Sequence, residues 1–471
     1  MKINKLNIIL FLLTFVLHKG AFAQSEKWVL ELIGDGKQVA ITQKGGGTRY
    51  STYPTYKLNG KLVTAQDYAK PLLKKTALND KQGKGSLVQV TYTDAKLPKL
   101  VQSFYVYNGA DYILTDFTIE SANAQLTSNY MAPLNIKTMP SVLPQGDNRA
   151  LFIPFDNDKW IRFQSHPLSF DKLTSYEATA LFDNNSRKGF IIGSVEHDNW
   201  KSAVELSGGD KSNIKSLTFY GGAADTTTRD VIAHGSLTGK VIKSPKVLVG
   251  IFADWRAGME KYGEVNASIA PPREWAGDVP FGWNSWGVLQ FKLTYPKAME
   301  VSDYFKNNLQ NNNYGTGKTV VIGLDSGWDN FTEEELKAFV IKCEENGQIA
   351  GIYWTPFTDW GKKGERTIKE APQYKFKDAY AYADGKPQEL DGAYAVDPTH
   401  PAAEERMKYI SEKFRRCGFK YVKMDFMSHG SMEADKWHNP DVKTGIQAYN
   451  YGMKLINKYF SDMYINLSIA P

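Results

Sequence analysis

The pattern of apolar and polar positions changes near the middle of the chain. Between residues 28 and 249, short segments alternate apolar with polar residues, as Val88, Val90 and Tyr92 do. A period of two is typical of strands with one buried face. Similar segments cover residues 100–107, 112–119 and 189–195. Many short strands separated by turn residues predict a large β-sandwich over residues 24–250.

After this half, strand-like segments alternate with helical ones. Residues 251–279 are predicted to form a helix and a linker that contains Pro271 and Pro272. The predicted strands that follow cover residues 281–287, 319–325, 349–355, 421–426 and 463–469. The predicted helices between them cover residues 295–308, 333–346, 401–417 and 445–459. A regular succession of strands and helices predicts parallel strands joined by right-handed crossovers.

The faces of the predicted strands favour a barrel over an open sheet. In segment 421–426 the apolar face ends at Phe426, and the opposite face carries Lys423 and Asp425. Segment 463–469 repeats this alternation, with an apolar face that ends at Ile469. Helices cover both faces of an open α/β sheet, whereas the inner face of a barrel accepts polar groups near its C-terminal mouth. We therefore predict that residues 280–471 form an incomplete TIM-type (β/α) barrel that contains strands one to five.

Polar and aromatic residues gather at the predicted ends of these strands. They are Trp283, Asp325, Tyr353, Lys423 and Asp425. Carboxylates and lysine exchange hydrogen bonds with hydroxyl groups, and aromatic rings stack on the C–H faces of sugars. The set therefore favours a site for a polyhydroxylated ring. The β-sandwich half shows no comparable cluster, so its scattered Asp and His residues are interpreted as surface or turn residues.

The N-terminus has the composition of an export signal. Two lysines precede an apolar run over residues 6–17, and Ala21 and Ala23 supply the small residues of a cleavage site. The apolar run is too short to span a bilayer as a permanent helix. We predict a signal peptide over residues 1–23 and a periplasmic or secreted location.

N-terminal sequencing of the exported protein is expected to start at Gln24 or within a few residues of it, because signal peptidase cleaves after small residues. A soluble cytoplasmic protein that retains Met1 would contradict the prediction.

Composition narrows the class of partners. The 471 residues carry 57 basic and 51 acidic side chains, a net charge of +6 that is mild for this length. No run of Lys or Arg marks a nucleic-acid partner, and no membrane contact is predicted after signal cleavage. The 2 cysteines cannot build a disulfide framework. No segment has the spacing of a metal site, so neither a metal nor a cofactor is predicted.

Four short motifs occur together in order and at barrel spacing. They are FGWNSW at 281–286, LDSGW at 324–328, GIY at 351–353 and YVKMD at 421–425. This combination resembles the melibiase superfamily of retaining α-galactosidases and α-N-acetylgalactosaminidases. The preceding β-sandwich resembles the N-terminal domain of its larger members.

The resemblance implies a role for each candidate residue. Asp425 would attack the anomeric carbon as the nucleophile, and Lys423 would bond a ring hydroxyl and keep Asp425 ionised. Asp325 would hold the axial and primary hydroxyls of a galactose-type ring, and Trp283 and Tyr353 would line the pocket. The implied activity is exo-acting, retaining hydrolysis of α-linked galactose-type glycans by double displacement.

Two departures from the family pattern leave the exact activity open. Ser326 stands where the family commonly has a second aspartate. Ser468 is small where galactose-specific members place a larger group near the 2-hydroxyl, so an α-N-acetylgalactosaminidase is an alternative. The family's general acid/base aspartate follows the next strand, beyond Pro471, so we interpret the sequence as part of a longer enzyme. The sequence is also compatible with a catalytically inactive carbohydrate-binding fragment and with a transglycosylase.

Overall fold

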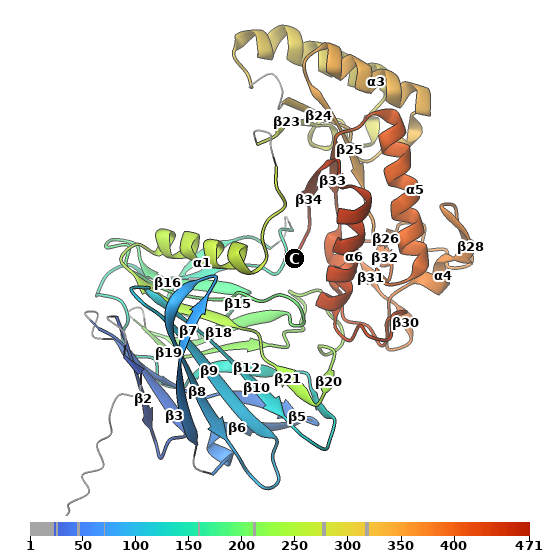
Figure 1. Ribbon diagram of the computed structural model, residues 1–471. Helices are drawn as coiled ribbons and strands as arrows, with labels where there is room; N and C mark the ends of the chain where they lie inside the picture. Colours follow the sequence, from blue (N-terminus) through green and yellow to red (C-terminus); the bar gives the residue numbers. More distant parts are fainter. Residues whose placement is uncertain are drawn as a thin grey trace, which may run out of the picture.

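The computed structural model describes residues 23–24, 27–44, 48–69, 71–158, 161–210, 213–275, 279–315 and 320–471. These residues form a β-rich region followed by an α/β region, and the C-terminal residue lies between the two (Figure 1). All but one residue of the predicted signal peptide lie outside the described ranges. No helix among the described residues is long and apolar enough to cross a membrane.

Two large antiparallel sheets make up most of the β-rich region. The 10-stranded sheet consists of β7 (Leu72–Asp80), β8 (Gly83–Tyr92), β9 (Lys99–Tyr107), β10 (Tyr112–Glu120), β13 (Asn148–Phe152), β14 (Gln164–Pro167), β16 (Ala178–Asp183), β17 (Gly189–Ser194), β21 (Val241–Lys243) and β22 (Val247–Phe252). The 6-stranded sheet consists of β5 (Thr55–Leu58), β6 (Lys61–Thr64), β12 (Met131–Ile136), β15 (Lys172–Tyr176), β18 (Ser202–Gly209) and β19 (Ile214–Gly221).

Smaller sheets complete this region. The 4-stranded sheet contains β1 (Ala23–Gln24), β2 (Trp28–Ile33), β3 (Gln38–Gln43) and β4 (Arg49–Thr52), and a 2-stranded sheet pairs β11 (Leu126–Ser128) with β20 (Leu237–Gly239).

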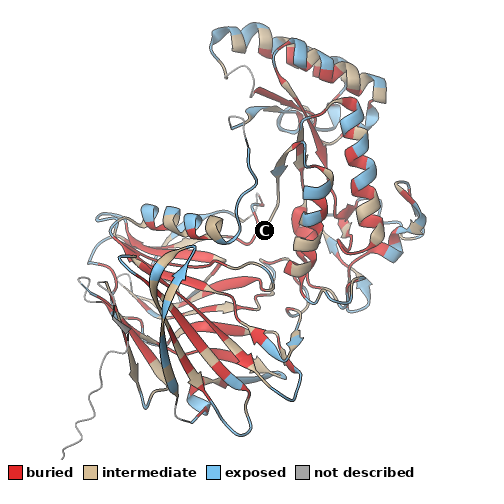
Figure 2. Ribbon diagram, in the orientation of Figure 1, coloured by how far each residue is buried: buried red, intermediate tan, exposed pale blue. Residues whose placement is uncertain are grey.

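The two large sheets share one hydrophobic core. Phe104 and Phe117 from the 10-stranded sheet and Leu134 and Phe219 from the 6-stranded sheet belong to the same cluster, and all four are fully buried. The alternation seen in the sequence places these apolar residues on the inner faces. The predicted strands at β8, β9, β10 and β17 are confirmed. In Figure 2 the strands of this sandwich are largely buried.

Helix α1 (Trp255–Ile269) covers the outer face of the 10-stranded sheet. Asp254 caps its N-terminus, where the carboxylate accepts a hydrogen bond from the Arg256 amide at 3.0 Å. Strand β22 runs to Phe252, two residues beyond the predicted end of the sandwich at residue 250, so the helix begins later than the pattern predicted.

The α/β region is built on a 5-stranded parallel sheet in the order β23-β24-β25-β33-β34. Its strands are β23 (Phe281–Asn284), β24 (Val320–Gly323), β25 (Ile349–Trp354), β33 (Tyr421–Met424) and β34 (Tyr464–Leu467). Its main helices are α2 (Tyr295–Tyr304), α3 (Glu333–Glu345), α5 (Pro401–Cys417) and α6 (Gly445–Tyr459). This is the strand–helix succession that the sequence predicted, and both cysteines are free and buried.

Local sequence signals explain the ends of these helices. Thr332 and Glu335 form a capping box at the start of α3. Pro401 opens α5 after His400, whose ring accepts a hydrogen bond from the Ala402 amide, and Gly418 ends the helix in the left-handed conformation at φ 94°.

The helices cover one face of the parallel sheet. Val422 and Met424 of β33 are fully buried in the core that also contains Phe339 of α3, Phe414 of α5 and Ile456 of α6. The opposite face carries the polar residues. The predicted separation of an apolar, helix-covered face from a polar face is therefore observed in β33.

Two residues assigned to the apolar faces leave the strands instead. Phe426 and Ile469 each lie two residues beyond the last residue of their strand, at φ 55° and φ 46°. This left-handed backbone breaks the alternation, so the prediction that they extend the helix-covered faces was wrong. The ring of Phe426 instead packs edge-on against Trp360, with centroids 4.8 Å apart.

A small antiparallel subdomain between β25 and α5 was not predicted. It contains β26 (Thr358–Asp359), β27 (Thr367–Ile368), β28 (Ala371–Lys375), α4 (Phe376–Ala379), β29 (Tyr382–Ala383), β30 (Lys386–Pro387), β31 (Glu389–Leu390) and β32 (Ala393–Ala395). Apart from β28, which has 5 residues, these strands have only two or three residues and leave too little periodicity to detect.

Candidate active site

Lys423 is the centre of a charged cluster at the C-terminal end of the parallel sheet. Its Nζ lies 2.9 Å from Asp325 Oδ2 and 3.0 Å from Asp425 Oδ2. The ammonium also lies 5.3 Å from the centroid of the Tyr353 ring. The two carboxylates are nearly buried, at 4% and 9% exposure, and Lys423 is at 20%. The structure therefore brings together four of the six predicted site residues.

Strand register explains why these residues meet. Tyr353 of β25 pairs with Lys423 of β33, and residues directly opposite in a parallel pair point to the same face. Asp425 continues the ladder, because its amide donates a hydrogen bond to the Trp354 carbonyl at 2.9 Å. Asp325 follows β24, and its amide donates instead to a side chain, the Ser285 hydroxyl, with N and Oγ 2.9 Å apart.

Each carboxylate is held by donors on both of its oxygens. Asp425 Oδ1 accepts a hydrogen bond from the Phe426 amide at 2.9 Å, and Asp325 Oδ1 accepts one from the Ser326 amide at 2.8 Å. Asp325 Oδ2 also accepts a hydrogen bond from Asn284 Nδ2 at 2.9 Å. These contacts stabilise negative charge and fix the direction of both groups.

The cluster also determines the charge state of its other members. Burial of the ammonium acts to lower the pKa of Lys423, but the carboxylates of Asp425 and Asp325 outweigh it, so the pKa is raised above its ordinary value. Burial, together with the same two carboxylates, raises the pKa of Tyr353. Lys423 is therefore a cation at neutral pH, and the Tyr353 phenol is protonated.

Trp283 lies on the other face of the sheet. It pairs with Ile322, which belongs to the helix-covered core, and its own ring packs against that core. The next residue, Asn284, pairs with Gly323 and points to the site face, where it contacts Asp325. The prediction that Trp283 lines the site was therefore wrong, and Asn284 faces the site instead. Asn284 belongs to the same motif, but the alternation of residues did not identify it as a site residue.

Ser468 lies beside the site at the end of β34. Asn466 pairs with Lys423, so Ser468 follows two residues later on the same face. The backbone amide and carbonyl of Ser468 both form hydrogen bonds. Its amide donates to the Met424 carbonyl at 2.9 Å, and its carbonyl accepts from the Met427 amide at 3.5 Å. Ser468 is thus close to the cluster in the sheet, and its side chain is partly exposed.

Residues from the β-rich region reach the same end of the sheet. Asp156 and Asp158 form ion pairs with Arg229, at 2.9 Å and 2.5 Å. Asp156 Oδ2 also accepts a hydrogen bond from Ser428 Oγ at 2.9 Å, three residues after Asp425. Both aspartates are nearly buried, so the interpretation of the scattered acidic residues as surface groups was wrong here. Only the contacts between the β-rich region and the α/β region show that these two aspartates lie near the site.

The subdomain contributes a third segment to this area. Asp391, an exposed residue in the turn between β31 and β32, is within electrostatic range of Arg229 and Asp425, and partial burial of its carboxyl group raises the pKa. His429 joins this turn to the segment after the nucleophile candidate. Its Nδ1 lies 3.0 Å from the Phe426 carbonyl, and its Nε2 lies 2.8 Å from the Leu390 carbonyl. His429 is therefore buried and links the two segments through its ring nitrogens, and burial lowers its pKa to about 4.

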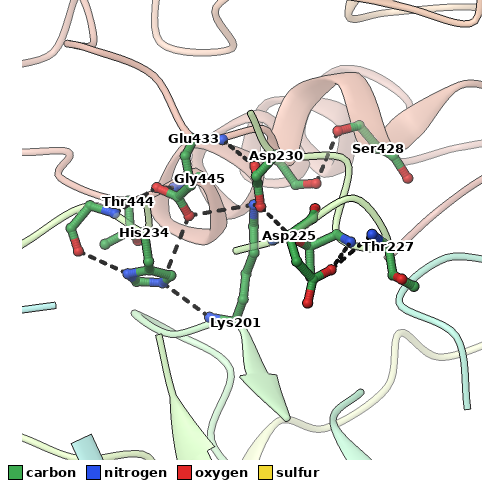
Figure 3. A network of polar contacts seen from close by, with 12 residues as sticks. Lys201, Asp225, Thr227, Asp230, His234, Ser428, Glu433, Thr444 and Gly445 are labelled. Atoms are coloured by element: carbon green, nitrogen blue, oxygen red, sulfur yellow. Dashed lines mark hydrogen bonds and ion pairs between the residues drawn. The ribbon is translucent and has the colours of Figure 1, made fainter. Parts of the chain in front are cut away.

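A fully buried ion network lies behind this area, at the interface of the two regions (Figure 3). Lys201 Nζ is 2.6 Å from Asp230 Oδ2 and 3.4 Å from Glu433 Oε1. Glu433 Oε2 accepts hydrogen bonds from the amides of Gly235 and Gly445, both at 3.0 Å. Removing one partner of such a network leaves a buried charge uncompensated, which typically costs about 3–5 kcal/mol. The network therefore holds the α/β region against the sandwich.

Comparison with solved structures identifies the fold. A GH36 α-galactosidase of Geobacillus stearothermophilus in complex with raffinose aligns with 88% of this chain and 61% of its own, at TM-score 0.56 and 13% identity. The chain has the fold of the GH36 α-galactosidases. An α-galactosidase from Lactobacillus brevis aligns with 94% of this chain and 69% of its own, at TM-score 0.57 and 11% identity.

Another glycosidase shares the α-galactosidase fold. A β-arabinopyranosidase aligns with 95% of this chain and 66% of its own, at TM-score 0.59 and 11% identity. No protein-family model and no curated protein sequence matches the chain. The chain spans about three fifths of the length of the Geobacillus α-galactosidase.

Proposed function

We propose that this protein is a retaining glycoside hydrolase that removes terminal α-galactose-type residues. The observation that carries the proposal is the position of Lys423 between Asp325 and Asp425, at the C-terminal strand ends of an α-galactosidase fold. Active sites of barrels built from alternating strands and helices lie at this end. The solved α-galactosidases in complex with raffinose and stachyose have the same fold and support the choice of substrate class.

Each residue of the cluster has a distinct role in the proposed reaction. Asp425 attacks the anomeric carbon, and the bond to the leaving group breaks as the glycosyl-enzyme forms. Lys423 and the Phe426 amide hold the attacking carboxylate in place. Asp325, fixed by Asn284, accepts hydrogen bonds from sugar hydroxyls. Water then hydrolyses the intermediate with net retention, assisted by a general acid/base group.

α-Galactosyl fluoride tests the proposal with the full chain, because fluoride leaves with little help from an acid. We expect a burst of about one fluoride per protein and a covalent galactosyl adduct on Asp425 by peptide mass spectrometry. Where turnover follows, proton NMR is expected to show α-galactose as the first product. The absence of both burst and adduct would contradict the proposal and favour a carbohydrate-binding role.

The same assay distinguishes the two sugars. Ser468 is small and lies on the site face, which leaves room for an acetamido group at C2. A missing bulky group does not repel galactose, so we expect α-galactosyl fluoride to remain the better substrate, with discrimination of about 10–200-fold at most. A higher burst rate with the N-acetylgalactosaminyl fluoride would instead favour the α-N-acetylgalactosaminidase.

A further inference from the structure

Two neighbouring strand ends share an unusual backbone conformation. Phe426 and Ile469 both have positive φ, and because Met424 pairs with Leu467, the two residues lie at corresponding positions. Bulky and β-branched residues rarely adopt this conformation, and it persists where surrounding contacts hold it. The two ends are also joined, since the Ser428 amide donates to the Ile469 carbonyl at 2.9 Å.

One short segment of the β-sandwich contacts both strand ends. Asp156 Oδ2 accepts a hydrogen bond from Ser428 Oγ at 2.9 Å. The next residue, Asn157, accepts one from the Ala470 amide through its Oδ1, also at 2.9 Å. Residues 156–157 therefore connect the segment after β33 to the segment after β34, across the sheet end where the nucleophile candidate lies.

The sandwich holds this segment rigidly. Arg229 donates to both oxygens of Asp156, from Nε at 2.9 Å and from Nη2 at 3.1 Å. Ser428 and the side chain of Asp156 are fully buried. A second attachment lies a few residues further along the same loop, where the Glu433 amide donates to Asp230 Oδ1 at 2.7 Å. Figure 3 shows Ser428 and this buried network close together at the interface.

The contacts lead directly to the nucleophile candidate. Asp425 Oδ1 accepts its hydrogen bond from the Phe426 amide, so the direction of the carboxylate follows the left-handed turn at Phe426. That turn is held on its C-terminal side by Ser428. We propose that Asp156 of the β-sandwich is a positioning residue for Asp425 and acts through the Ser428 hydroxyl. The proposal rests on the proposed function, because it assumes attack by Asp425.

The burst with α-galactosyl fluoride measures positioning separately from binding. We expect Ser428→Ala and Asp156→Ala each to lower the burst rate constant by about 10–100-fold, because a misplaced nucleophile reacts slowly. The dissociation constant obtained from saturation of the burst rate is expected to stay within about twofold. Because the two residues act as one unit, the double variant is expected to be no slower than the slower single variant.

Asp116→Asn is the matched control. Asp116 is a buried aspartate of the same sandwich that pairs with Lys243 at 3.5 Å, away from the parallel sheet. The substitution is expected to lower the melting temperature and leave the burst rate constant unchanged. Ser428→Ala removes a single hydroxyl, so it carries the test even where Asp156→Ala does not fold.

The outcomes separate this proposal from the proposed function. An unchanged burst rate constant in folded Ser428→Ala, or effects of the two substitutions that multiply in the double variant, would overturn the positioning role while wild-type protein still forms its adduct. The lack of any adduct on wild-type Asp425 would overturn the proposed function itself.

Discussion

Asp425→Ala is expected to lower the burst rate constant with α-galactosyl fluoride by about 10⁴-fold or more, since the attacking group is gone. In the structure this carboxylate is nearly buried and is fixed through both oxygens, by Lys423 and by the Phe426 amide. No adduct should be detected by mass spectrometry. Substrate binding should persist, because Asp325 and Asn284 remain in place.

Azide provides a positive signal from the same variant. A small anion fits the space that the carboxylate leaves and attacks the same face of the sugar, so fluoride departs and β-galactosyl azide forms. Asp303→Ala is the control, since Asp303 forms a surface ion pair with Lys342 on the outside of the α/β region. Asp425→Ala protein with near wild-type burst rates, or azide products in the α configuration, would remove Asp425 from the mechanism.

Lys423→Met is expected to lower the burst rate constant by about 100-fold or more. Lys423 makes a charge-assisted contact to each of two carboxylates, at 2.9 Å and 3.0 Å. A hydrogen bond to a charged group is worth roughly 1.5–3 kcal/mol, and about 1.4 kcal/mol corresponds to a factor of ten in rate. Stopped-flow measurement of fluoride release at saturating substrate checks the size of the loss.

The pH profile of this variant gives an independent check. The pKa of Lys423 is higher in the folded protein than its ordinary value of about 10.4. In wild-type protein the charged lysine therefore stabilises the fold fully at pH values below about 10.4, and this stabilisation is lost only as the pH rises through the higher pKa of the folded state. Without the cation, the like charges of the two adjacent carboxylates repel each other with no compensating charge between them. The acidic limb of the burst-rate profile is therefore expected to move to higher pH in Lys423→Met.

Lys246→Met is the matched control for this pair of measurements. Lys246 is at 17% exposure and lies 3.6 Å from Asp116 and 3.4 Å from Glu196, so it also separates two carboxylates, but within the sandwich. Its replacement is expected to leave the burst rate and the pH profile unchanged. An unshifted acidic limb in Lys423→Met, or an equal shift in the control, would show that Lys423 does not govern the charge of the cluster.

Local signals in the sequence were sufficient for most of the architecture. Period-two alternation predicted β8, β9, β10 and β17, and the helical period predicted α5 with its observed limits, which Pro401 and Gly418 mark in the structure. Alternation along β33 also predicted that Lys423 and Asp425 share a polar face, away from the helices. These features depend on neighbouring residues only, so they can be read from a single sequence.

Features that depend on how strands are paired could not be predicted. Trp283 and Asn284 are adjacent, and only the register with β24 shows that Asn284 faces Asp325. The left-handed turns at Phe426 and Ile469 end the alternation where the sequence continues it, because contacts from other elements hold them.

The residue pattern alone specified the two-part architecture and placed Lys423 and Asp425 together on one polar strand face, whereas the role of Asp425 as nucleophile came from the family resemblance. Only the folded structure shows which part of the sandwich lies against Lys423 and Asp425. Asp156 and Ser428 are separated by 272 positions, and Asp230 and Glu433 by 203. Neither pair has a local pattern, because a buried hydrogen bond or ion pair is specified by the packing that excludes water around both partners. The interface that we propose to position Asp425 is therefore a property of the tertiary fold.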